Sequence, residues 1–235
     1  MPRGSALGVV ADLWRYPVKS FGGERLRRVF VGPFGLLGDR RYAVADDQGV
    51  MTARRASALL GFTARYSDTD AAEHLTVTTP SGDVVGIDDE TFLGQLARAV
   101  PAAASVATSP LGLFDAAPLH ILSEPSVVAL GADVGTDLDR RRFRANILVE
   151  PTGADAFAED AWIGRRLLVG EALVEVVVNT ERCVVTTFDP DTQDRDPRVL
   201  KALATTRENL FGVYARVLRP GWVATGDPIL PAEAG

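Results

Sequence analysis

The chain has 235 residues, of which 46% are hydrophobic and 24% are charged, and its formal net charge at pH 7 is −6. This composition is typical of a soluble globular protein with one or two domains and a core that needs no disulfide bonds. The negative charge argues against a nucleic-acid partner, because neutralising phosphates requires a basic surface. The sequence has one cysteine and no apolar run as long as a membrane span or a signal region. We therefore expect a cytoplasmic protein without a membrane partner.

Short runs rich in β-branched and aromatic residues, each closed by Gly, Pro, Asp or Ser, recur along the chain and predict strands. Residues 46–49 separate two such runs and form a predicted hairpin turn, because Gly49 supplies a positive φ at little cost. Strands this short and this evenly spaced favour barrels over a parallel sheet. The predicted strands cover residues 9–14, 41–44, 62–66, 75–78, 146–149, 166–169, 172–178, 214–218 and 229–230.

Three helices are predicted from apolar spacing and from end signals. The first covers residues 91–100 and has aspartates before it as caps. The second begins at Pro125, with Ser123 as its cap, and the third runs from Pro197 toward residue 205.

The proline- and alanine-rich stretch 101–118 is the predicted boundary between two β-rich parts of the chain. We expect a mixed α/β, β-rich fold in which residues 1–115 form an N-terminal β-barrel-like domain. Residues 116–235 are expected to form a second β-barrel with a few short helices.

Cys183 follows Arg182 and lies between an apolar strand-like run and a polar loop. A neighbouring cation favours the thiolate, which is the form that attacks substrates or binds metals. Cys183 is therefore a candidate reactive thiolate or soft metal ligand. The alternative is a small buried apolar residue, which is how most free cysteines behave.

Lys19 and Ser20 end the turn Tyr-Pro-Val-Lys-Ser and are followed by Phe21 and two glycines. A lysine, a hydroxyl and exposed backbone N–H groups in a glycine-flanked loop suit an anion such as phosphate. A plain surface turn is the alternative.

Arginines gather in two places in this acidic chain. Arg40 and Arg41 follow a glycine turn, and four arginines occur within residues 140–144. If residues 141–146 are extended, Arg142, Arg144 and Asn146 share one face, because side chains alternate along a strand. Guanidinium groups match phosphate and carboxylate geometry, so this segment predicts an anion site, with a solvated or ion-paired surface as the alternative.

Other sites are poorly supported. The acidic run 189–196 does not fit a calcium loop, because Asp194 occupies the position that needs glycine. A zinc site lacks ligands, since His74 and His120 are far apart in sequence. A nucleophilic pair of Cys183 and His120 remains open without a local motif. The sequence contains neither a P-loop nor a dinucleotide fingerprint.

Seven motifs, in order and spread over most of the chain, resemble those of MOSC-domain proteins that carry an N-terminal MOSC β-barrel domain. The resemblance is to the bacterial and mitochondrial amidoxime-reducing component family. The motifs are YPVKS at 16–20, GDRRY at 38–42, MTAR at 51–54, ILSE at 121–124, RFRAN at 142–146, AEDAW at 158–162 and RCVVTTFDPDT at 182–192.

The resemblance implies a molybdenum cofactor, with molybdenum held by an anionic pterin dithiolene, and no pyridoxal phosphate. Cys183 would be the protein ligand to molybdenum and a catalytic residue, and Asp189 would supply a proton. Residues that would contact the pterin, its phosphate or the pocket wall are Lys19, Ser20, Arg40, Thr52, Arg54, Ser123, Arg142, Arg144, Asn146, Arg182 and Thr187.

The function implied is reduction of small N-hydroxylated substrates such as amidoximes, hydroxylamines and N-oxides. Electrons would come from a separate partner, a ferredoxin, a flavoprotein or a haem protein, because the sequence has no further cysteines for an iron–sulfur domain. Two alternatives stay open, namely sulfur transfer through a persulfide on Cys183 and a non-catalytic carrier of the cofactor.

Overall fold

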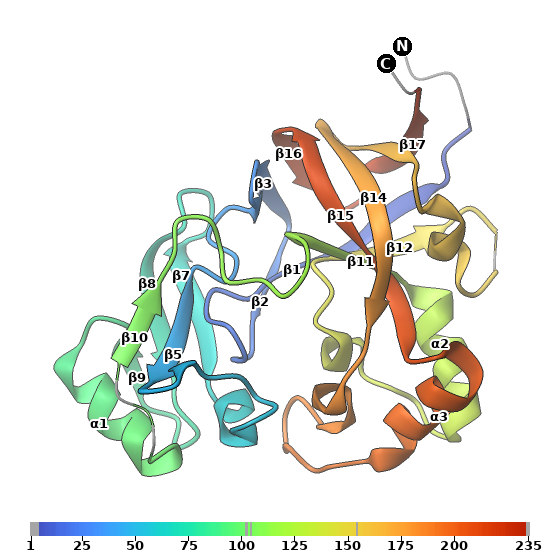
Figure 1. The fold of residues 1–235 in the computed structure, drawn as a ribbon. Helices are drawn as coiled ribbons and strands as arrows, with labels where there is room; N and C mark the ends of the chain where they lie inside the picture. Colours follow the sequence, from blue (N-terminus) through green and yellow to red (C-terminus); the bar gives the residue numbers. More distant parts are fainter. Residues whose placement is uncertain (1–4, 102, 104, 154, 234–235) are drawn as a thin grey trace.

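The computed structural model describes residues 5–101, 103, 105–153 and 155–233. Its largest sheet has eight strands, of which seven close into a barrel because β12 pairs with both β11 and β1. Figure 1 shows the blue strand β1 among the green-to-red strands of the second half. The strand order is β12 (Ile147–Pro151), β11 (Leu119–Ser123), β15 (Leu210–Arg219), β14 (Ala172–Glu181), β13 (Arg166–Val169), β17 (Pro228–Ala232), β1 (Gly8–Arg15) and β2 (Glu24–Leu26).

The barrel interior is filled by apolar side chains from alternating strand positions. Leu167 and Val169 of β13, and Val174 and Val176 of β14, are at most 1% exposed. Residues two apart on a strand face the same side of the sheet, so the period-2 pattern directs these side chains inward. The barrel is therefore a packed core that supports the loops at its ends.

The N-terminal half contains two three-stranded sheets and one helix beside the barrel (Figure 1). Phe21, Phe62 and Phe92 form the centre of its core, with ring centroids 5.1 to 6.5 Å apart. The elements are β5 (Tyr42–Asp46), β6 (Gly49–Val50), β10 (Ser105–Thr108), β7 (Thr63–Asp68), β8 (Glu73–Thr78), β9 (Val84–Gly86), the 3₁₀ helix η1 (Ser57–Gly61) and α1 (Glu90–Ala99).

A third small sheet joins the two halves, because β3 (Arg28–Gly32) pairs with β4 (Gly35–Leu36) and with β16 (Gly221–Ala224). Helices α2 (Glu124–Val134) and α3 (Pro197–Arg207) pack together beside one end of the barrel, over Phe143 and Phe211. Three further 3₁₀ helices are η2 (Arg140–Phe143), η3 (Ala158–Trp162) and η4 (Val184–Thr187).

The expected β-rich mixed fold is confirmed, and so are the hairpin turn at 46–49 and the three helices. Helix α1 begins behind Asp89, whose carboxylate accepts a hydrogen bond from the backbone N–H of Thr91 at 2.8 Å. Ser123 occupies the N-cap position of α2, but its hydroxyl pairs with Ser126 at 2.6 Å instead of a backbone N–H.

The prediction that residues 141–146 are extended is wrong for its first part. Residues 140–143 form the 3₁₀ helix η2, and Arg144 follows with a φ of 55°. The carboxylate of Asp139 caps this helix by accepting the backbone N–H of Arg141 at 2.7 Å. The turn sends Arg142 and Arg144 in different directions, so they do not share the face that an extended strand would give them.

The predicted boundary between residues 115 and 116 stays a prediction, because β1 and β2 complete the sheet that the second half builds. A Cβ atom on Gly8 would lie 2.5 Å from the carbonyl oxygen of Glu150, so the two backbones approach closely there. Within the described residues, no helix is both long and apolar enough to cross a membrane.

Candidate functional site

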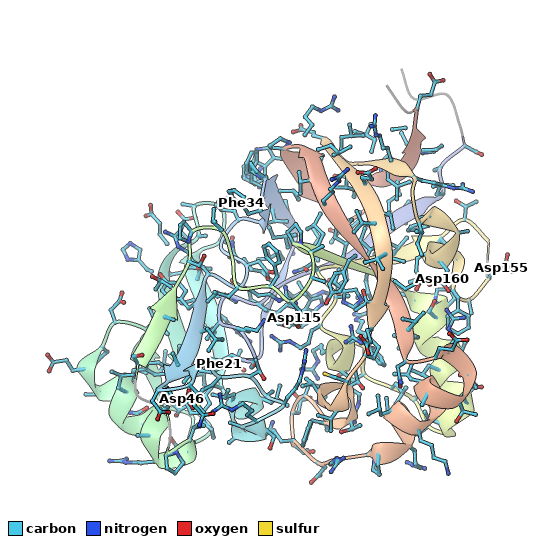
Figure 2. All side chains as sticks on the ribbon, in the orientation of Figure 1. Phe21, Phe34, Asp46, Asp115, Asp155 and Asp160 are labelled. Carbon is cyan, nitrogen blue, oxygen red and sulfur yellow. The ribbon has the colours of Figure 1, made fainter. Side chains whose placement is uncertain are left out.

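A pocket of about 660 Å³, open solvent at its mouth included, contains Cys183 and takes residues from both halves of the chain. Figure 2 shows Asp115, one of its lining residues, in the middle of the molecule between the two halves. The N-terminal half supplies Lys19, Ser20, Arg40, Thr52, Ala53 and Arg54. The rest are Asp115, His120, Phe143, Arg144, Glu181, Arg182, Cys183, Val185 and Tyr214.

Cys183 lies two residues after the end of β14 and at the N-cap position of η4. Its carbonyl oxygen accepts hydrogen bonds from the backbone N–H of Thr186 at 3.1 Å and from the Thr186 hydroxyl at 2.9 Å. The side chain is half-buried and lines the pocket. The strand end and the short helix thus fix the backbone of the residue that carries the thiol.

Lys19 and Ser20 are held by the turn that follows β1. The Lys19 ammonium donates to the carbonyl oxygen of Leu113 and to Asp115, both at 2.7 Å. Ser20 has a φ of 70°, and its hydroxyl accepts the backbone N–H of Ala53 at 2.9 Å. This bond ties the turn to the segment that presents Thr52 and Arg54 to the pocket.

Arg40 is fixed on several sides. Its guanidinium pairs with Asp39 and donates to the Asn146 side chain at 3.3 Å and to the Arg144 carbonyl at 3.2 Å. Burial opposes the charge, but Asp39 outweighs it and raises the pKa of Arg40. Asp39 also accepts the backbone N–H of Tyr16 at 2.7 Å, which connects Arg40 to the end of β1.

Arg144 projects from its left-handed backbone toward the N-terminal half. It donates to the carbonyl of Phe21 at 2.6 Å, and its guanidinium carbon lies 4.3 Å from the centroid of the Tyr16 ring. Burial lowers the pKa of Arg144 to about 10, so it stays charged at neutral pH. Its buried Nη2 atom has no hydrogen-bond partner among the described residues.

Arg182, which is half-buried, and His120, which is buried, are polar groups on the second-half side of the pocket. The Arg182 guanidinium donates to the carbonyl of Phe143 at 2.7 Å, and burial lowers its pKa. Burial, together with the charges of Arg182 and Arg40, lowers the pKa of His120 well below 6.5, so its imidazole is neutral at pH 7. Among the described residues, Nε of Arg182 and Nε2 of His120 have no hydrogen-bond partner.

The pocket is positively charged and conformationally strained. Five cationic and two acidic side chains line it, a formal excess of three positive charges in a chain whose net charge is −6. Ser20, Arg40 and Arg144 all have a positive φ, of 70°, 47° and 55°. Left-handed non-glycine residues cost free energy and cluster at binding sites, where they fix side-chain direction.

The structure places Lys19, Ser20, Arg40, Thr52, Arg54, Arg144 and Arg182 around Cys183, as the sequence predicted, and their roles stay predictions. Met51, which begins the motif at 51–54, is 3% exposed and packs in the N-terminal core.

Besides Asp189, four residues predicted at the site lie outside its wall. Ser123 and Thr187 are fully buried, and their hydroxyls bond to Ser126 and to the carbonyl of Val184. Arg142 donates to the carbonyl of Thr187 at 3.1 Å and to Asp189 at 2.8 Å, away from Cys183. Asn146 is 1% exposed, and it reaches the pocket through hydrogen bonds with the Arg40 guanidinium and with the backbone of His120. The 3₁₀ helix η2 explains why Arg142 and Asn146 do not line the pocket, because it interrupts the strand that was expected there.

Asp189 does not fit the role of proton donor. Burial alone would raise its pKa, but bonds from the backbone N–H groups of Thr192 and Asp191, and the Arg142 charge, lower it overall. Asp189 is therefore a carboxylate at neutral pH, and it does not line the pocket.

Sequence reasoning missed several residues of the pocket, among them Asp115, Glu181 and Tyr214. Asp115 lies in the stretch interpreted as a domain boundary, and Tyr214 lies in a run interpreted only as a strand. His120 was a candidate partner for Cys183 without a local motif, and the structure brings the two into one pocket. The single available signal was the polar residue His120 within an otherwise apolar strand.

Two family models match this chain in succession. The MOSC N-terminal beta barrel domain matches residues 7–107, and the MOSC domain matches residues 108–230. The mitochondrial amidoxime-reducing component 1 of Homo sapiens is 27% identical, over 95% of this chain and 82% of its own length.

The other matches cover a smaller share of the related protein or have a lower sequence identity. The mitochondrial amidoxime reducing component 2 of Rattus norvegicus is 35% identical, over 49% of this chain and 37% of its own length. The molybdenum cofactor sulfurase of Caenorhabditis briggsae is 26% identical over 90% of this chain, which spans 34% of that protein's length. The YUAD protein from Bacillus subtilis has the same fold, with a TM-score of 0.55, 15% identity and full coverage of both chains. Two matching models that together span residues 7–230 establish that the chain belongs to the MOSC-domain family and carries the MOSC N-terminal beta barrel domain.

Proposed function

We propose that the pocket around Cys183 holds a molybdenum cofactor and that the protein reduces N-hydroxylated compounds with electrons from a separate protein. One observation carries the proposal. The only thiol of the chain lines a pocket with five cationic side chains, two of which have buried nitrogen atoms with no hydrogen-bond partner in the described part of the chain. Buried cations without counter-charges are costly, so this arrangement suits an anionic ligand.

The donor set fits such a cofactor. A thiolate is a suitable further ligand for a metal already bound by dithiolene sulfur, which assigns Cys183 to the metal end. Lys19, Ser20, Arg40 and Arg144 would bind the anionic pterin and phosphate groups through N–H and O–H donors. When bound, the cofactor supplies two-electron oxygen-atom transfer, and reduction of an N–OH group to N–H consumes two electrons and two protons and releases water.

The protein residues contribute binding and placement. The Asp39–Arg40–Asn146 contacts hold one guanidinium in a single orientation, so little freedom is lost when an anion binds. Asp115 neutralises Lys19 and lies 3.8 Å from Arg54, so an anion must compete with it. The neutral His120 adds a hydrogen-bonding group without adding to the positive charge.

Metal analysis of the protein from a molybdenum-replete host tests the proposal. We expect about one molybdenum per chain, and we expect Cys183→Ser to lose the metal while it keeps the fold. Arg182→Gln should retain less cofactor than Arg142→Gln, a matched change outside the pocket. Absence of molybdenum, or equal metal content in Cys183→Ser, contradicts the proposal.

Activity assays separate the alternatives that share this pocket. Reduction of benzamidoxime with an artificial electron donor identifies an enzyme rather than a carrier of the cofactor. The similarity to a molybdenum cofactor sulfurase favours sulfur transfer as the second candidate. In that case Cys183 carries cyanide-releasable sulfur, and Cys183→Ser abolishes sulfur transfer with metal content unchanged.

A further inference from the structure

A second cavity adjoins the cysteine pocket. It has a volume of about 750 Å³, open solvent at its mouth included, and it shares Arg144 and Val185 with that pocket. Val185 lies two residues after Cys183, so part of the common wall belongs to the segment that carries the thiol. Like the first pocket, this cavity lies between the halves, with Arg65 on β7 at one side and Phe188 at the other.

Much of the lining of the second cavity is apolar. Trp14, Leu60 and Phe188 are half-buried and leave part of their apolar surface toward it, and Tyr16 adds a buried ring. A cavity of this volume with aromatic walls suits the body of a small planar molecule, because most of its surface is buried there.

The charges around the second cavity divide into paired and unpaired groups. Arg141 is paired with Asp191 at 2.6 Å and Arg142 with Asp189 at 2.8 Å. Within the described part of the chain, Arg65 forms no ion pair. Arg65 is exposed, so it can meet an anion without the cost of a buried charge.

We propose that the second cavity binds the non-reacting end of the substrate, a planar aromatic body with a carboxylate that pairs with Arg65. The inference rests on the proposed function only for the reacting end, which would lie toward Cys183 beyond the shared wall. Substrates with an aromatic carboxylate are therefore preferred over neutral ones of the same size. The ion pair fixes the orientation, and the apolar walls supply most of the affinity.

Calorimetric titration and steady-state kinetics of the full-length protein test the inference with 4-carboxybenzamidoxime and neutral benzamidoxime as probes. Arg65→Gln should weaken binding and raise the KM of the carboxylated probe about fivefold, with its kcat and the values for the neutral probe unchanged. Arg98→Gln, the same change at an exposed position on α1, should alter neither the affinity nor the KM of either probe. Leu60→Trp should fill the cavity and weaken binding of both probes, whereas Leu93→Trp on α1 should not.

The two proposals fail in different ways. If the carboxylated probe binds with the expected dependence on Arg65 and Leu60 but is not reduced, the cavity assignment stands and the proposed activity is wrong. If the probe is reduced while its affinity and KM are the same in the wild type, Arg65→Gln and Leu60→Trp, the cavity assignment is wrong and the proposed activity stands.

Discussion

The buried imidazole of His120 shows how the site's charges act on a single residue. Only 3% of this side chain is exposed, and its ring centroid lies 5.6 Å from that of Tyr214. Burial and two nearby guanidinium groups keep the imidazole neutral, because a further positive charge would be desolvated and repelled. The folded protein at neutral pH therefore contains His120 in its neutral form.

The stability of the protein should fall on acidification because of His120. Its pKa is lowered in the folded state, so below about pH 6.5 the unfolded chain binds a proton that the folded chain excludes. Between the pKa values of His120 in the unfolded and folded states, each pH unit of acidification should lower the free energy of unfolding by about 1.4 kcal/mol. Denaturant unfolding at pH 7.5 and pH 5.5 measures the effect.

His120→Leu should show a smaller loss over this pH interval than the wild type. His74→Asn is the control, since His74 is exposed and has a φ of 55° that asparagine tolerates. The same pH dependence in the wild type and His120→Leu would contradict the assignment.

At the scale of elements, strand β15 approaches β11 so closely that only glycine fits at position 212. A Cβ atom there would lie 2.5 Å from Nε2 of His120 and 2.8 Å from the carbonyl oxygen of Ile121, and the φ of Gly212 is 78°. Gly135, at the end of α2, has an almost identical φ of 79°, but a Cβ atom there meets nothing within 4 Å.

A comparison of the two glycines separates the cost of a left-handed backbone from the cost of a steric clash with neighbouring atoms. Gly135→Ala should cost about 1–2 kcal/mol of unfolding free energy, which is the usual cost of a left-handed backbone. Gly212→Ala should add about 1–3 kcal/mol to this, because a well-packed region must move. Thermal or urea unfolding of both variants checks the difference, and equal losses would show that the contact with His120 is relieved without cost.

The elements that could be predicted from the sequence are those set by local patterns. The α3 helix follows from Asp196 and Pro197, since a side-chain cap and a proline at the first turn act within a few residues. Residues 140–144 could not be assigned in this way. The cap at Asp139 competes with an apparent strand pattern, and ion pairs with distant acids such as Asp191 then place the arginines.

At the scale of the whole molecule, the pocket depends on contacts across nearly the full length of the chain. The motifs predicted half of the residues that line the pocket with Cys183, because charge and resemblance identify residue types. Sequence spacing cannot show that Asp115 and Tyr214 also line the pocket. Asp115 lies in a loop and Tyr214 in a strand, and only the closed barrel brings the two together.

Closure of the barrel by β1 makes the second half dependent on the N-terminal strand. A chain that begins at residue 28 lacks β1 and β2 and leaves open strand edges on β12 and β17, so we expect it not to fold. Moving residues 5–27 behind residue 233 through a short glycine–serine linker should restore the fold. Gly8 pairs with Ile229, which brings these two segments together.

Circular dichroism melting and limited proteolysis of both chains measure this dependence. The permuted chain should show a cooperative transition, and the shortened chain should show none. A shortened chain that melts like the intact protein would show that β1 does not contribute to closure.

The pairing of β1 with strands made much later has a consequence for the timing of assembly. During translation β1 is made before the other strands of the barrel, and although β2 follows it directly, its barrel neighbours β12 and β17 appear only after more than half of the chain has been made. β12 is complete once residue 151 has been made, but the barrel cannot close until β17 has been made, and the pocket around Cys183 is complete only after Tyr214 has been added. Binding of the proposed cofactor would therefore have to wait until nearly the whole chain has been made, and until then the edges of β1 that await β12 and β17 are exposed to pairing with other chains.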